Sequence, residues 1–98
     1  MNGAEKAYSL RLGMMLAMGE IAWYNFEAIT LKLAKDTRYT PDFAVINKNG
    51  ELEYHEIKGF LRDDALVKIK VAAEMFPFIF RMFIYKKKQF IEKDFTVR

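Results

Sequence analysis

A chain of 98 residues with a net charge of +3 has the length for one hydrophobic core, so we expect a single domain over residues 1–98. Because 52% of the residues are apolar and 30% are charged, the composition excludes a disordered segment and indicates a soluble domain. The absence of cysteine excludes disulfides and thiolate metal sites, which favours a reducing cytoplasm and oxygen ligands for any metal. The apolar runs are too short to span a membrane, and no targeting signal is evident.

Charged residues are unevenly distributed along the sequence. Counted along the sequence, residues 1–35 carry +1, residues 36–64 carry −3 and residues 65–98 carry +5. An acidic middle beside a basic end suits a metal site that acts on a polyanion such as DNA, since the metal needs acids and the phosphates need bases.

Nine Phe, five Tyr and one Trp are many for so small an interior, so we also expect self-association, as a homodimer.

The first predicted element is a helix over Asn2–Met18. Asn2 can cap it, Glu5 follows three residues later as in a capping box, and Gly19 supplies a C-terminal stop. The apolar stripe on the same side as Glu5 consists of Tyr8, Leu12 and Met15. We therefore expect the Glu5 carboxylate to project from the buried side of the helix.

Extended segments follow the helix. The sequence predicts strands over Ile21–Phe26, Ile29–Ala34, Tyr39–Ile46 and Leu52–Lys58. Ile29–Ala34 alternates apolar and polar residues most regularly, and Pro41 falls where a strand start or edge tolerates a missing N–H. We expect these strands to form the main part of one sheet.

The Asn49-Gly50 pair between the last two strands indicates a β-hairpin. A two-residue turn would set Asp42 opposite Ile57, whereas a three-residue loop over 48–50 with left-handed Gly50 sets Asp42 opposite Glu56. We favour the three-residue loop. Strand alternation would then keep Lys58 on the same face as Glu56.

A second helix is predicted to be capped by Asp63 or Asp64 and to run through Phe76, with Pro77 ending it. Its buried stripe would comprise Leu66, Ile69, Ala73 and Phe76. A dense apolar strand over Phe78–Tyr85 and a short tail strand complete the chain. The order of helix, three main strands, helix and strand predicts an α/β (α+β) fold with a mixed sheet flanked by helices.

Two acids and an ammonium group meet at the predicted hairpin. Asp42, Glu56 and the backbone carbonyl of Ile57 could hold Mg²⁺ or Mn²⁺ and still leave positions for water and phosphate. Lys58 would reach the same water or phosphate, as phosphodiester hydrolysis requires.

Thr40-Pro41-Asp42-Phe43 and Glu56-Ile57-Lys58-Gly59, with thirteen residues between the two acids, resemble the PD-(D/E)XK nuclease signature. The chain is similar to small phage-encoded endonucleases and Holliday-junction-resolvase-like proteins. The resemblance implies a restriction-endonuclease-like αβββαβ core and a metal on Asp42 and Glu56. It also implies that Lys58 orients or activates the attacking water and that an acid on the first helix, here Glu5, assists through metal-bound water.

The function expected from this resemblance is a divalent-metal-dependent endonuclease that cleaves DNA, with branched DNA as one candidate substrate. The setting would be DNA recombination in the cytoplasm of a bacterial or phage-infected cell. One alternative is a DNA-binding module that keeps a nuclease-like fold without turnover. Another is an assembly protein whose acids are surface groups, with Glu56 and Lys58 an ordinary exposed pair.

Several residues have two interpretations. Glu5 could serve the helix cap, the metal site or both. His55 alternates to the face opposite Glu56, which favours a surface or packing role. Candidate phosphate contacts are Lys68, Lys70, Lys86, Lys87 and Lys88. Lys70 could instead pair with Glu74, and the three consecutive lysines could simply blunt a strand edge.

Overall fold

The computed structural model describes residues 1–59 and 63–97. Within them lie α1 (Gly3–Ala17), β1 (Ile21–Phe26), β2 (Leu31–Ala34), β3 (Thr37–Tyr39), β4 (Phe43–Asn47), β5 (Leu52–Lys58), α2 (Asp63–Met75), β6 (Ile79–Lys86) and β7 (Gln89–Asp94). The chain has no described helix that is long and apolar enough to cross a membrane.

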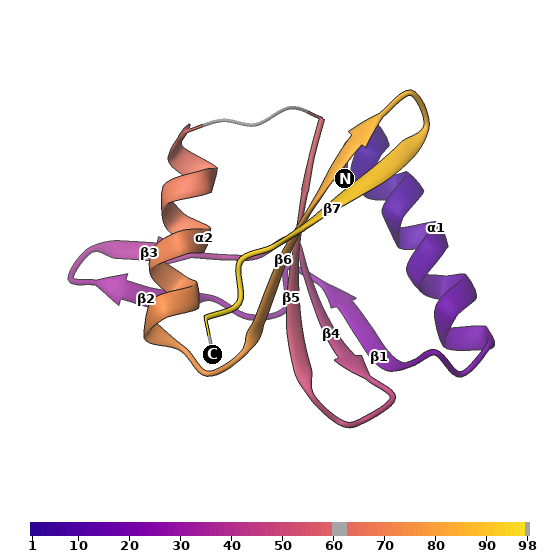
Figure 1. Cartoon of the computed structure of the whole chain (residues 1–98), viewed down its shortest axis with the longest axis horizontal. Helices are drawn as coiled ribbons and strands as arrows, with labels where there is room; N and C mark the ends of the chain where they lie inside the picture. The colour runs from indigo at the N-terminus through magenta and orange to yellow at the C-terminus, as the bar shows by residue number, and fades with distance from the viewer. Residues whose placement is uncertain (60–62, 98) are drawn as a thin grey trace.

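The main sheet has the strand order β1-β4-β5-β6-β7. The pair β5 and β6 is parallel and joined through α2, whereas the other neighbours are antiparallel. α1 covers one face of this sheet, and α2 covers the other together with the β2–β3 hairpin (Figure 1). The fold is therefore α+β, with a mixed sheet flanked by helices, as the sequence predicts.

Local signals determine where α1 begins and ends. Asn2 Oδ1 accepts a hydrogen bond from the Glu5 N–H at 2.8 Å, and Glu5 Oε1 accepts one from the Asn2 N–H at 2.8 Å. Gly19 follows the helix with φ +76°, a left-handed conformation that glycine adopts without strain. The predicted capping box and stop are both confirmed.

Each face of the sheet packs against its own apolar cluster. The α1 side is built from Tyr8, Leu12, Ile21, Phe43, Val45, Ile57 and Phe83. The α2 side is built from Leu31, Tyr39, Ala44, Tyr54, Ile69, Ala72, Ala73, Phe80 and Met82. Because neighbouring residues of a strand face opposite sides, Glu56 lies on the α2 side while His55 lies on the α1 side. Central strand β5 thus carries buried polar groups to both faces.

The prediction of one continuous strand over Tyr39–Ile46 is wrong. β3 ends at Tyr39 and β4 begins at Phe43, so the chain leaves one sheet and enters another between them. Pro41 is buried in this crossing, where it needs no N–H partner in a ladder. Asp42 consequently sits immediately before β4 rather than within a strand.

The predicted strand over Ile29–Ala34 is only partly correct. Its alternation is present, since Leu31 is buried, but β2 begins at Leu31 and pairs with β3 alone. The resulting two-stranded sheet packs on α2 instead of joining the main sheet. An alternating pattern reports one buried face and does not say which partner buries it.

The C-terminal half follows the prediction closely. α2 begins at Asp63, so Asp63 and Asp64 both lie within the helix and the prediction that one of them precedes it as the cap is wrong. Its predicted stripe packs on the sheet, with Ile69 and Ala73 buried and Phe76 partly buried. β6 and the tail strand β7 then form the last hairpin.

Candidate active site

The hairpin between β4 and β5 has the predicted three-residue loop. Asn47 pairs with Glu51 through the N–H of Asn47 and the Glu51 carbonyl at 3.0 Å, and Gly50 turns with φ +82°. Phe43 lies opposite His55, so the next position of the same register sets Asp42 beside Glu56. The register that brings the two acids together is confirmed.

Glu56 is a buried carboxylate with two donors. Only 5% of the residue is exposed, its Oε1 accepts a hydrogen bond from the Tyr39 hydroxyl at 2.9 Å, and its Oε2 lies 3.0 Å from Lys58 Nζ. The interpretation of Glu56 and Lys58 as an ordinary exposed pair is therefore wrong. Since a carboxylate has about four acceptor positions, both oxygens retain capacity for a further ligand.

Asp42 lies at the start of β4, where its Oδ2 accepts a hydrogen bond from the Ile57 N–H at 2.8 Å. Burial and then the negative charge of Glu56 raise the pKa of Asp42 to about 7, against an opposing effect of the Ile57 hydrogen bond. Within residues 1–59 and 63–97, no hydrogen bond reaches the other oxygen, Oδ1. Among the described residues, Asp42 Oδ1 therefore keeps its capacity for a further ligand, while the nearby charge of Lys58 acts to lower the pKa of this carboxyl.

Lys58 supplies the positive charge on the Glu56 side. Burial by itself would lower the pKa of Lys58, but the Glu56 carboxylate, its hydrogen bond and the charge of Asp42 together raise it. The ammonium group is therefore protonated throughout the physiological pH range. In this charged state it can donate hydrogen bonds.

The backbone N–H and C=O of Ile57 are oriented toward the edge of β5 at which Asp42 lies. Because the N–H and C=O of one strand residue point to the same edge of the strand, and the Ile57 N–H points to Asp42, its carbonyl oxygen is also directed toward that edge. β4 begins only at Phe43, so no ladder partner from β4 continues beyond Asp42. This arrangement matches the predicted third oxygen donor.

Glu5 caps α1, which is one of the two roles predicted for it from the sequence. Its carboxylate bonds the backbone of Asn2, and its charge also contributes to the raised pKa of Asp42. The helix therefore brings Glu5 near the acid pair while its carboxylate completes the capping box. A direct role of Glu5 in the site stays a prediction.

The donors fit a hard divalent cation with few protein ligands. Among the residues that the structure describes, no group of three His, Cys, Asp or Glu side chains could hold a metal. Two carboxylates and one carbonyl are nevertheless a typical protein contribution to Mg²⁺, which keeps several waters. A pocket of about 370 Å³ lies at the other end of the sheet, lined by Glu51, Ile79, Arg81, Asp94 and Thr96, and does not include these donors.

No family model, curated protein or solved structure matches this chain. The chemistry assigned to the site rests on the geometry of its own residues.

The predicted phosphate contacts are exposed. Lys68 donates to the Arg38 carbonyl at 3.1 Å, and the described residues show no ion pair between Lys70 and Glu74. Lys86 is the last residue of β6, and Lys87 and Lys88 form the two-residue turn to β7. These three residues are called the basic turn over 86–88. Since β5 and β6 run parallel and Lys58 lies beside Ile84, this turn extends from the same end of the sheet as the acid pair.

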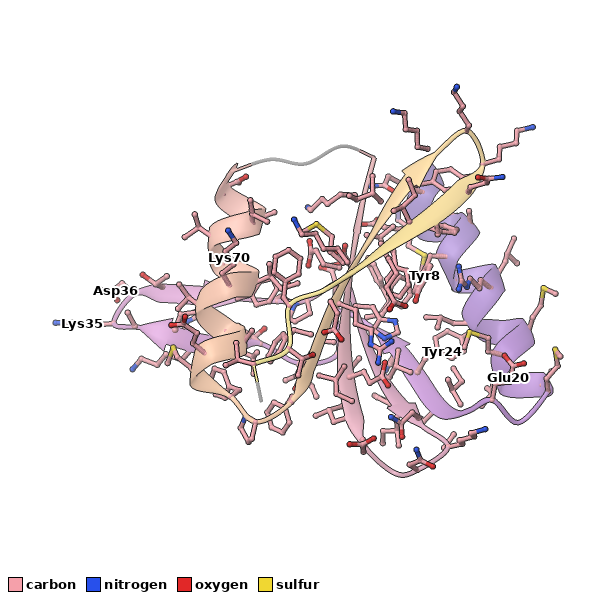
Figure 2. All side chains as sticks on the ribbon, in the orientation of Figure 1. Tyr8, Glu20, Tyr24, Lys35, Asp36 and Lys70 are labelled. Carbon is pink, nitrogen blue, oxygen red and sulfur yellow. The ribbon has the colours of Figure 1, made fainter. Side chains whose placement is uncertain are left out.

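His55 belongs to a separate buried network on the α1 side. It is 5% exposed, its Nδ1 lies 2.6 Å from the Tyr8 hydroxyl, and its Nε2 lies 2.8 Å from Glu53 Oε1. Figure 2 shows Tyr8 between α1 and the sheet. The packing interpretation of His55 is confirmed, and it lies on the face opposite Glu56 as expected.

Sequence reasoning missed Tyr39, which is 5% exposed and hydrogen-bonded to Glu56. Burial, followed by the charge and hydrogen bond of Glu56, raises its pKa, so the hydroxyl stays protonated as a donor. Its position three residues before Asp42 is a weak signal, because nothing in the spacing says that the chain folds back onto β5. Tyr39 orients the carboxylate that the site requires.

Tyr39→Phe should weaken Mn²⁺ binding by roughly 10- to 100-fold, the usual effect of losing a hydrogen bond that orients a metal ligand. Isothermal titration calorimetry measures the dissociation constant. The matched control is Tyr54→Phe, on the same face and also buried, but without a hydrogen bond to an acid. Equal Mn²⁺ affinity in the two variants would show that Tyr39 contributes to packing and not to metal binding.

Proposed function

We propose that this chain is a divalent-metal-dependent endonuclease that hydrolyses DNA phosphodiester bonds. The observation that supports this most strongly is the hairpin register, which sets Asp42 beside Glu56 with Lys58 ion-paired at 3.0 Å. The order of α1, β1, β4, β5, α2 and β6 is also the αβββαβ order expected from the resemblance, with β2–β3 inserted and β7 added. The proposal includes Mg²⁺ or Mn²⁺ as the cofactor.

In this proposal Asp42, Glu56 and the Ile57 carbonyl hold the cation. The cation would neutralise charge on the scissile phosphate and polarise the attacking water. Lys58, held by Glu56, would donate a hydrogen bond to the phosphate or to that water and stabilise negative charge as it develops. The charges of Glu56 and Asp42 raise the pKa of Lys58, which supports its role as a positive donor.

The basic turn over 86–88 would contact the phosphate backbone on the same end of the sheet. Replacing Lys86 by Gln and both Lys87 and Lys88 by Asn should reduce the slope of log binding constant against log salt by up to about three, since each duplex phosphate contact contributes about 0.9. Asn suits positions 87 and 88 because their φ values are +51° and +60°. Fluorescence anisotropy on duplex DNA at several salt concentrations measures the slope.

The control is Lys48→Gln, in the turn at the opposite end of β5. This change should leave the salt slope unaltered. A triple variant whose slope equals that of the wild type would remove the turn over 86–88 from the DNA-binding surface.

A cleavage assay on branched, duplex and single-stranded DNA tests the proposed function. Wild-type protein should cut at least one substrate in Mg²⁺ or Mn²⁺, and chelation should stop it. Glu56→Ala and Lys58→Ala should each reduce the rate by about 10²-fold or more, whereas exposed Glu74→Ala should not, with circular dichroism confirming that each variant is folded. Cleavage that survives both site changes would reject the site, and DNA binding without any cleavage would instead support a non-catalytic module.

A further inference from the structure

The side of α1 that is turned away from the sheet is mostly apolar. Tyr8 and Leu12 are buried against the sheet. The residues on the outer side recur at spacings of four and three, and they are Gly3, Ala7, Leu10, Met14 and Ala17. Leu10 is 73% exposed, Met14 is 65% exposed and the adjoining Met18 is 70% exposed. A four-three spacing of apolar residues is the pattern of a helix that packs along another helix.

The charges around this outer face are few and are placed at its ends. Arg11 does not shield it, because its guanidinium lies 5.7 to 5.8 Å from the ring centroids of Tyr8, Phe83 and Phe90. Lys6 is exposed beside the first part of the face. Glu20 is exposed just beyond the C-terminal end of the helix, where Figure 2 shows it away from the sheet. The face thus has a positive group at one end and a negative group at the other.

We propose that two copies of this chain associate through the outer faces of α1, with the two helices antiparallel. In this arrangement Lys6 meets the C-terminal end of the other helix, where Glu20 of the partner subunit and the terminal carbonyls are negative. The last turn of α1 has no basic residue of its own to satisfy them. A parallel pair would instead bring Lys6 toward Lys6 of the partner subunit.

The pairing is closed and symmetric. A twofold axis near the middle of the helix places Leu10 and Met14 of both copies in one apolar seam, and both Lys6–Glu20 contacts form together. The helix has 15 residues, so Glu5 of the two copies would lie roughly 20 Å apart, at opposite ends of the seam. The interface does not use Asp42, Glu56 or Lys58, and it is independent of the proposed nuclease activity.

Sedimentation velocity on the full chain tests the interface. The wild type should be a dimer, and Met14→Lys should raise the dimer dissociation constant by about 30-fold or more, as expected for a charge at the centre of an apolar interface. Val71→Lys is the matched control, because Val71 is an exposed apolar residue of α2, and its dimer should dissociate like the wild type. A monomeric wild type, or a dimer that Val71→Lys disrupts and Met14→Lys does not, would overturn the proposal.

Charge reversal tests the direction of the helices. Lys6→Glu and Glu20→Lys should each weaken the dimer by about two- to fivefold for each exposed pair lost, and the double reversal should restore wild-type affinity. If Lys6→Glu alone strengthens the dimer, or if the double variant is as weak as the single ones, the antiparallel pairing is wrong.

Discussion

Asparagine in place of Asp42 should abolish metal-dependent cleavage and, without metal at pH 8, raise the free energy of unfolding. The pKa of Asp42 rises from 3.8 to about 7 because of burial and the neighbouring Glu56 charge. The folded state therefore binds this proton more tightly than the unfolded state does. The stability it contributes is fully present below pH 3.8 and is lost as the pH rises through about 7. Asparagine removes the buried charge and keeps an oxygen for the Ile57 N–H.

Urea denaturation from pH 5 to pH 9 measures this effect, with and without Mn²⁺. The stability advantage of Asp42→Asn over the wild type should grow from pH 5 to about pH 7 and stay constant above it, and added Mn²⁺ should stabilise the wild type alone. The control is Asp36→Asn in the β2–β3 turn, where φ is +61° and asparagine is equally suited. The Asp36→Asn variant should have the same free energy of unfolding as the wild type at every pH. Cleavage by Asp42→Asn at the wild-type rate would contradict the assignment.

Methionine in place of Lys58 should have the second large effect, because it leaves Glu56 buried without its ammonium partner. The Glu56 side chain is 6% exposed and that of Lys58 is 29% exposed. Breaking such a pair should destabilise the metal-free protein by up to about 3 kcal/mol at pH 8, the lower end of the range for buried pairs since Lys58 is partly exposed. Cleavage should fall by about 10²- to 10³-fold because a preorganised donor is lost.

The two effects of Lys58→Met should separate when metal is added. Mn²⁺ should restore much of the stability, since a cation replaces the missing positive charge, while the cleavage rate stays low. Thermal denaturation and single-turnover cleavage in the same buffer measure both quantities. Exposed Lys48→Met serves as the control. A variant that regains full cleavage with metal would show that Lys58 only balances the charge of Glu56.

Local signals made the central geometry predictable. The Asn49-Gly50 pair with Gly50 in the left-handed region determines the loop length, and the loop length determines which residues lie opposite one another. Asn2 and Glu5 similarly determine the start of α1 through bonds three residues apart. These features depend on neighbouring residues, so the sequence pattern contains them directly.

Features that depend on distant segments were not predictable in the same way. Tyr39 reaches Glu56 across 17 residues because β3, which belongs to the two-stranded sheet, packs over the α2 side of the main sheet. His55 meets Tyr8 across 47 residues only after α1 packs on β5. Alternation predicted the face of His55 but not its partners, and it predicted the strand around Leu31 but not its sheet.

The most direct test is a crystal structure of the protein soaked in Mn²⁺, with anomalous scattering recorded to locate the ion. The proposed site predicts one strong peak in contact with the carboxylates of Asp42 and Glu56 and the carbonyl of Ile57, and no such peak in Asp42→Asn. A saturated crystal with no peak between these two acids would contradict the metal site and, with it, the nuclease mechanism.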